Sequence, residues 1–76
     1  FLNNLKLNIM AILKVIEVLS NSKKSWEDAA QNAVAEASKT VKHITSVNVN
    51  NQSLTVKNGK VDEYRLNVKI TFAVNK

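Results

Sequence analysis

Few side chains in this 76-residue sequence have the chemistry for catalysis. It contains one histidine, His43, one glycine, Gly59, and no cysteine. A serine nucleophile on a sharp strand-to-helix turn needs flanking glycines, and the loops that bind nucleotide phosphates need several glycines, so both kinds of site are excluded. Thiolate nucleophiles, disulfides and thiolate metal sites are excluded because cysteine is absent. We therefore expect a protein that is not an enzyme.

Two pairs of adjacent acids are the remaining candidates for a reactive or metal-binding site. Adjacent positions on a helix point in different directions, so we interpret Glu27 and Asp28 as residues that complement the positive end of a helix dipole. Asp62 and Glu63 lie beside a predicted turn, and we interpret them as solvated, with a surface cation site as the alternative. His43 is interpreted as a solvated residue near a helix end.

The charge of the chain is positive but dispersed. Eleven lysine and arginine residues against six acids give a net charge of +5, without any run of five like charges, which argues against a basic tail. A positive field can attract anionic ligands such as phosphates, and solubility is the alternative explanation. A nucleic-acid surface needs basic residues interleaved with aromatic ones, whereas we interpret Trp26, Tyr64 and Phe72 as core.

The length corresponds to one domain, and a domain of this size buries only about 60% of its unfolded surface. Such a small core usually needs disulfides, a metal or partner subunits, and oligomerisation is the one that we expect. Residues 1–9 precede the only methionine, Met10, and are interpreted as an N-terminal extension of unknown role, with the domain at residues 10–76. They lack the features of a signal peptide, and we expect a cytoplasmic protein.

The first predicted element is a strand over residues 12–19, which is rich in β-branched side chains and is followed by three small polar residues. Both of its faces are apolar, whereas a strand with one face in water alternates more regularly. Nothing else in the chain is large enough to cover the second face. One face carries Leu13, Val15 and Leu19, and the other carries Ile12, Ile16 and Val18.

A helix is predicted over residues 25–43. Ser25 and Asp28 have the spacing of a capping box, with Asp in place of the commoner Glu. Cationic side chains at positions 39, 42 and 43 fall in the last predicted turns, where the helix dipole favours them. An apolar stripe of mostly alanine, which lets a sheet approach closely, recurs at helical spacing and comprises Trp26, Ala29, Ala30, Ala33, Val34, Ala37, Val41 and Ile44.

Residues 45–57 and 61–74 are predicted to pair as a β-hairpin. Asn58-Gly59 between them is the strongest two-residue hairpin signal, because a type I′ turn requires positive φ at both positions. The second strand alternates between apolar and polar residues with a period of two, as a half-buried strand does. Four polar residues at positions 50–53 interrupt the first strand and predict a bulge or bend.

The hairpin is longer than the helix that must cover it. Its 13-residue strand extends about 43 Å, whereas a 19-residue helix spans about 28 Å. A right-handed crossover places strand three between strands one and two, which leaves an apolar edge strand open to association. The prediction is an α+β, β-α-β-β domain with a three-stranded antiparallel sheet (order 1-3-2) wrapped on one helix, which forms oligomers.

Four segments carry a resemblance to a known family: residues 14–18 (KVIEV), 25–30 (SWEDAA), 37–41 (ASKTV) and 58–65 (NGKVDEYR). Together with the order and spacing of the elements, they resemble the bacterial dodecins from residue 11 to about residue 74. The resemblance implies a hollow dodecamer that binds the flavins riboflavin or FMN as stacked pairs between subunits. Family members are thought to store flavin, and some relatives have been linked to calcium or coenzyme A.

The resemblance also implies candidate flavin-binding positions: Thr45, Ser46, Asn51 and Arg65. Flavin-binding dodecins stack a tryptophan on the flavin at the position of Ser46, and bind the flavin edge with a glutamine at the position of Arg65, after a tyrosine that matches Tyr64. A guanidinium can stack on an aromatic plane and pair with a phosphate, so Arg65 can favour an anionic ligand such as FMN. The alternative is an ion pair of Arg65 with Glu17 or Glu63 across subunits or strands.

Two functions therefore remain open. The first is a small-molecule binding and storage protein that sequesters flavin between the subunits of a dodecamer. The second is a dodecameric shell with weak or no flavin affinity, which binds another anionic ligand or calcium, or is purely structural. Ser46 and Arg65, which replace the expected tryptophan and glutamine, motivate the second. An aromatic stack is worth about 1–3 kcal/mol, and its loss weakens binding roughly 5- to 150-fold.

Overall fold

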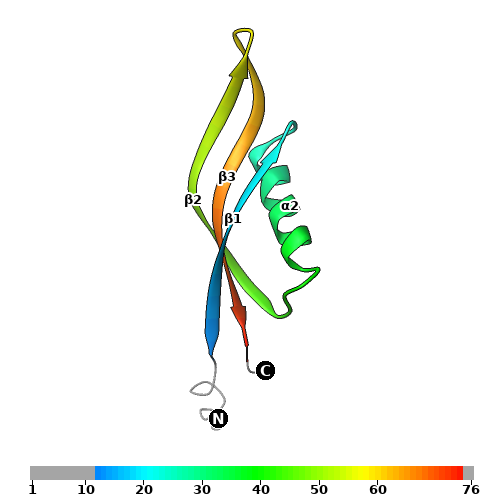
Figure 1. The fold of residues 1–76 in the computed structure, drawn as a ribbon, viewed down its shortest axis with the longest axis vertical. Helices are drawn as coiled ribbons and strands as arrows, with labels where there is room; N and C mark the ends of the chain where they lie inside the picture. The colour runs from blue at the N-terminus through cyan, green and yellow to red at the C-terminus, as the bar shows by residue number, and fades with distance from the viewer. Residues whose placement is uncertain (1–11, 75–76) are drawn as a thin grey trace.

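The computed structural model describes residues 12–74, and the extension interpreted at residues 1–9 lies outside them. The elements follow the order β1 (Leu13–Ser22), α2 (Trp26–Ala37), β2 (Ile44–Lys57) and β3 (Lys60–Ala73). The strands form one antiparallel sheet of order β1-β3-β2, with α2 on one side of it (Figure 1). The predicted α+β, β-α-β-β architecture and its strand order are therefore confirmed.

Strand β1 is longer than the sequence predicted. The three small polar residues that were taken as its end, Ser20, Asn21 and Ser22, continue the ladder and pair with Leu66, Arg65 and Tyr64. Polar residues stay in the strand here because β3 offers backbone partners along that whole length. The extension brings the polar end of β1 beside the part of the hairpin where candidate site residues lie.

Helix α2 begins where it was predicted to begin and ends earlier. The Ser25 hydroxyl accepts a hydrogen bond from the Asp28 backbone N–H at 3.0 Å, which confirms the N-cap. The predicted helix end at His43 is wrong, because the helix stops at Ala37 and residues 38–40 form a turn. His43, with φ of 63°, accepts a backbone hydrogen bond from Ala73 at 3.0 Å, so pairing with β3 ends the helical path. The predicted basic last turn is consequently absent from α2.

The core lies between α2 and the centre of β3. Ala29 and Ala33 of the helix and Val68 and Ile70 of the strand are at most 2% exposed. The small alanine side chains let the helix backbone approach the sheet, and the larger aliphatic groups of β3 fill the space between them. Ile16 and Val18 of β1 and Val47 of β2 pack around this cluster. The alanines of the predicted stripe are thus confirmed as the buried side of the helix, whereas its last two members, Val41 and Ile44, lie beyond the helix end.

The hairpin has the predicted turn and a more irregular ladder than predicted. Asn58 and Gly59 have φ of 53° and 77°, the positive values that a type I′ turn requires. The register shifts between Val49 and Asn51, which confirms the bulge expected within residues 50–53. Two further shifts, at the start of β2 and near its end, were not predicted.

The hairpin extends well beyond the helix (Figure 1). Its 14-residue strands reach about 46 Å, whereas the 12 residues of α2 span about 18 Å. Leu54, Val56 and Val61 near the tip are 42%, 66% and 51% exposed. The overhang inferred from the sequence is therefore present, and its apolar side chains are left without cover in the single chain.

Candidate functional site

The two faces of the sheet differ in chemistry. Leu66, Val68 and Ile70 of β3 point towards α2, so the alternate residues Arg65, Asn67 and Lys69 lie on the opposite face. We call this second face, which α2 does not cover, the open face. The registers place two rows of residues on it that run across all three strands and are polar except for one leucine: Leu19–Asn67–Asn51 and Asn21–Arg65–Ser53. The sheet thus gathers amide, hydroxyl and guanidinium groups from distant parts of the sequence.

A depression of about 270 Å³ lies on the open face at these two rows. This open-face depression is smaller than the roughly 300–1,000 Å³ of typical small-molecule sites. The exposed fraction of Leu19 beside it is 77%, so its wall is partly apolar. It is lined by Leu19, Ser20, Asn21, Asn51, Ser53, Arg65, Leu66 and Asn67.

Among the residues that the structure describes, Arg65 is the one charged residue that lines the open-face depression. Its side chain is exposed, and it forms no ion pair with any residue in the described part of the chain. Within residues 12–74 of one subunit, an ion pair of Arg65 with Glu17 or Glu63 across strands is therefore wrong, and the same pair across subunits stays a prediction. Glu63 instead accepts a hydrogen bond from the Asn21 side-chain amide at 3.0 Å.

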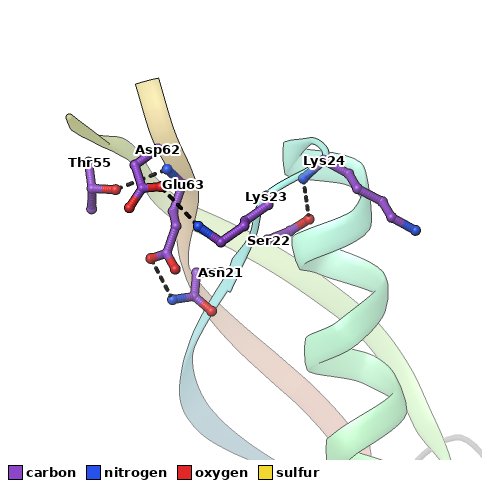
Figure 2. A network of polar contacts seen from close by, with 7 residues as sticks. All are labelled: Asn21, Ser22, Lys23, Lys24, Thr55, Asp62 and Glu63. Carbon is purple, nitrogen blue, oxygen red and sulfur yellow. Dashed lines mark hydrogen bonds and ion pairs between the residues drawn. The ribbon is translucent and has the colours of Figure 1, made fainter. Parts of the chain in front are cut away.

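A polar network joins the end of β1 to the hairpin and engages both acids that precede Arg65 (Figure 2). The Lys23 ammonium lies 2.9 Å from the Asp62 carboxylate. The backbone N–H of Glu63 donates to the Thr55 hydroxyl at 2.9 Å, while its carboxylate is turned towards Asn21 (Figure 2). The hydrogen bond and charge of Asp62 raise the pKa of Lys23. The acids that the sequence analysis interpreted as solvated are thus held by specific partners.

The start of α2 is tied to β1 by a second set of contacts. The Ser22 hydroxyl donates to the Asp28 carboxylate at 2.6 Å and accepts from the Lys24 backbone N–H at 2.9 Å. Asp28 therefore binds Ser22, where the predicted capping box would have it reach back to the Ser25 backbone. The acids at positions 27 and 28 lie in the first turn of the helix, as predicted.

Asn67 was not singled out from the sequence, and it occupies the middle of the open-face depression. Its side-chain oxygen Oδ1 is buried and has no hydrogen-bond partner among the described residues. A buried polar atom without a partner costs about 1–3 kcal/mol, and such an atom invites an explanation. Only its place on the polar face of β3 was readable from the sequence, because burial of the amide depends on how β1 and β2 flank it.

The structure brings two of the four predicted site residues together. Asn51 and Arg65 both line the open-face depression. Ser46 pairs with Thr71, six positions from Arg65 along β3, which is about 20 Å. Thr45 lies at a register shift and donates from its hydroxyl to the Thr71 carbonyl at 3.2 Å. Within one subunit, the expected stacking position and the expected edge-binding position are therefore far apart.

Trp26 belongs to the other face of the sheet. Its ring packs edge-to-face on Tyr64, with centroids 5.3 Å apart and planes at 78°, which supports its interpretation as a packing residue. The indole Nε1 is buried and finds no acceptor within residues 12–74. It borders a second hollow of about 270 Å³, lined also by Ala30, Val49 and Leu66. This mostly apolar hollow is lined by residues from the first turns of α2 and from β2 and β3.

His43 and the acids offer little for a metal. His43 is exposed, as predicted, beside a shallow hollow of about 510 Å³ that Phe72 also lines. Across residues 12–74, no group of three or more histidine, cysteine or acidic residues could hold a metal ion. Within residues 12–74, no helix is long and apolar enough to cross a membrane, and α2 has only 12 residues.

Comparison with known proteins gives consistent matches over the same region. The family model described as Dodecin matches residues 12–75. A calcium dodecin of Mycobacterium tuberculosis is 33% identical over 63 residues, which are 83% of this chain and 89% of that protein. A crystal structure of the calcium-chelating calcium dodecin of that species is 34% identical, with a TM-score of 0.74 over 84% of this chain and 91% of that chain. A variant of the T. thermophilus dodecin is 27% identical, with a TM-score of 0.82 over 87% and 98%.

Proposed function

The chain belongs to the dodecin family of small-molecule-binding proteins, and we propose that it sequesters a flavin, riboflavin or FMN, between the subunits of a hollow dodecamer. We propose a binding and storage role in the cytoplasm without a chemical step. The candidate binding residues are those that the sequence suggested, Thr45, Ser46, Asn51 and Arg65. We add Asn67 to these candidates because it lines the same depression as Asn51 and Arg65.

The observation that carries the proposal is the open-face depression itself. It combines an unpaired guanidinium, three carboxamides and an exposed aliphatic wall. A flavin offers matching groups: a broad apolar ring, a polar edge with hydrogen-bond donors and acceptors, and, in FMN, a phosphate. None of the described residues that line the depression is aromatic, so the ring would pack on aliphatic groups such as Leu19.

The size of the depression supports a site that is shared between subunits. At about 270 Å³ it can hold only part of a flavin. Ser46 lies about 20 Å from Arg65 along β3, so a ligand that touches both positions must lie between two copies of the chain. The uncovered apolar side chains of the hairpin, such as Val56 and Val61, favour the same assembly.

Flavin fluorescence provides the test. Purified protein titrated into riboflavin or FMN at micromolar concentration should quench the flavin emission to a saturating level. The absorbance of freshly purified protein between about 350 and 500 nm should also show any flavin that it carried from its source. If neither flavin is quenched at a protein concentration of about 100 μM, flavin sequestration is excluded for this chain.

Calcium is the second candidate, because the relative that is 33% identical is named a calcium dodecin. The described residues give it less support, since Asp62 is engaged by Lys23 and Glu63 by Asn21. Calcium prefers six to eight oxygen ligands, and no acidic cluster of three occurs within residues 12–74. Calorimetric titration of flavin-free protein with calcium would decide between calcium and flavin as the ligand. Native mass spectrometry would reveal a different anionic ligand such as coenzyme A, or an assembly without ligand, as a purely structural shell would be.

A further inference from the structure

The guanidinium of Arg65 is left free by the contacts that its neighbours make, and we propose that Arg65 makes the open-face depression select phosphorylated ligands over their uncharged analogues. For the flavins this means FMN over riboflavin. The inference rests on the proposed flavin binding, and it adds the residue and the charge that decide which form is held.

The acid nearest to Arg65 on its face of β3, Glu63, is occupied by another partner. Glu63 lies two positions before Arg65 on the same face of β3, about 7 Å away along the strand, which is within reach of two long side chains. Its carboxylate nevertheless accepts from Asn21 at 3.0 Å and is drawn towards β1 (Figure 2). Asp62 is bound by Lys23 at 2.9 Å. The polar network thus withdraws Glu63, the carboxylate on the same face of β3 that would otherwise neutralise the guanidinium.

The composition of the depression around Arg65 also favours an anionic ligand. The other residues that line it carry only neutral amides, hydroxyls and aliphatic groups, so no negative charge within the lining competes with an anionic ligand. The chain carries a net charge of +5, which adds a favourable field for anions. A guanidinium in such surroundings can bind a phosphate through two parallel hydrogen bonds, a geometry that a lysine ammonium does not offer.

Asn21 has a positioning role at the edge of the depression. Its side chain lines the depression and also holds the Glu63 carboxylate. Without that amide, Glu63 would be free to turn towards Arg65 and compete with the phosphate. Asn21 therefore acts on anion selection through Glu63, and its removal should lower the ratio of FMN affinity to riboflavin affinity.

The test compares the two flavins on the full chain and four variants by fluorescence quenching at low ionic strength. Arg65→Gln removes the guanidinium, and Lys69→Gln is the matched control, because it removes the same charge from the same face of β3 but lies outside the depression. Asn21→Ala tests the positioning role, and Asn21→Ala combined with Glu63→Gln tests whether Glu63 is the competitor. Circular dichroism and light scattering confirm that each variant keeps its fold and assembly.

We expect the unmodified protein to bind FMN at least about tenfold more tightly than riboflavin, as a charge-assisted contact should. Arg65→Gln should bring the two dissociation constants within about twofold, and Lys69→Gln should keep the preference for FMN. The variant that combines Asn21→Ala with Glu63→Gln should restore the preference for FMN that Asn21→Ala alone loses. Equal binding of both flavins by the unmodified protein, or equal losses in Arg65→Gln and Lys69→Gln, would overturn the inference and leave flavin sequestration standing. Failure to bind either flavin would overturn both.

Discussion

The two faces of the sheet differ in how far their side chains are buried or paired within one chain. On the side of α2, alanines of the helix and aliphatic residues of β3 exclude solvent, and Val68 and Ile70 have no exposed surface. On the open face, Arg65 has no ion-pair partner within residues 12–74 and the Asn67 oxygen has no donor there. The same strand β3 supplies both sets of side chains in alternation. One face therefore stabilises the subunit, and the other is available to a ligand and to further subunits.

The largest expected difference between the faces is in stability. Ile70→Ala should lower the free energy of unfolding by about 3 kcal/mol, because a fully buried aliphatic side chain is removed and a cavity remains. Lys69→Ala, one position away on the open face, should change it by less than about 0.5 kcal/mol. Urea unfolding at one fixed protein concentration measures both, since assembly makes stability depend on concentration. Equal losses would refute the division of β3 into a structural and an open face.

Leu19→Lys tests whether other subunits cover the open face at the edge strand β1, where Leu19 lies. In an isolated chain this substitution is nearly neutral, because Leu19 is 77% exposed. If a second copy buries this side chain, its loss weakens each contact by about 2 kcal/mol, or roughly 30-fold, and light scattering should show smaller species. Leu19→Met, which keeps an apolar side chain of similar size, is the control. Unchanged assembly of Leu19→Lys would show that this edge stays in water.

A smaller effect of unusual sign is expected at Asn67. Its buried oxygen has no partner among the described residues, so Asn67→Val should leave the free energy of unfolding of ligand-free protein unchanged or raise it by up to about 1 kcal/mol. Asn48→Val, at an exposed amide on β2, controls for the change in strand propensity. A loss of more than about 1 kcal/mol specific to Asn67 would mean that its amide is already satisfied in the assembled protein.

The smallest effect concerns the ion pair of Lys23 with Asp62, which is exposed to solvent and therefore contributes little. The hydrogen bond and charge of Asp62 raise the pKa of Lys23 above its ordinary value of 10.5. A raised pKa stabilises the folded state below the ordinary value, and the contribution is lost as the pH rises through the folded-state pKa. The stability difference between unmodified protein and Lys23→Gln should thus be constant from about pH 8 to 10 and shrink above that. Lys24→Gln is the control, because the Lys24 ammonium forms no ion pair within residues 12–74, and this variant should show no such pH dependence.

Local patterns predicted most of the fold because they acted in agreement with tertiary structure. The alternation in β3, the Asn58-Gly59 turn and the Ser25 cap each specify a backbone conformation within a few residues, and all three are confirmed. The helix end was wrong for the opposite reason. Residues 38–43 keep a helical apolar spacing, but the backbone of His43 pairs with Ala73, thirty positions away. A contact of that range leaves no local signal.

The site was less predictable than the fold. Asn51 and Arg65 were named from the family resemblance, and they do meet in one depression. The roles of Asn21 and Asn67 could not be read from the sequence, because they depend on registers that bring β1 and β2 to either side of β3. The freedom of Arg65 likewise depends on Glu63 being held by Asn21 across the sheet. Residue types indicated the chemistry, but only the register shows which groups remain unpaired.

Native mass spectrometry of the full chain with added FMN tests flavin sequestration by a dodecamer most directly, because it reports assembly and ligand together. We expect a complex of twelve copies of the 8.5 kDa chain that carries several FMN molecules, lost on dissociation into single subunits. Retention of FMN only by the assembly would show that the open face is completed by other copies. A monomer, or an assembly that binds no FMN at micromolar concentration, would contradict flavin sequestration by a dodecamer.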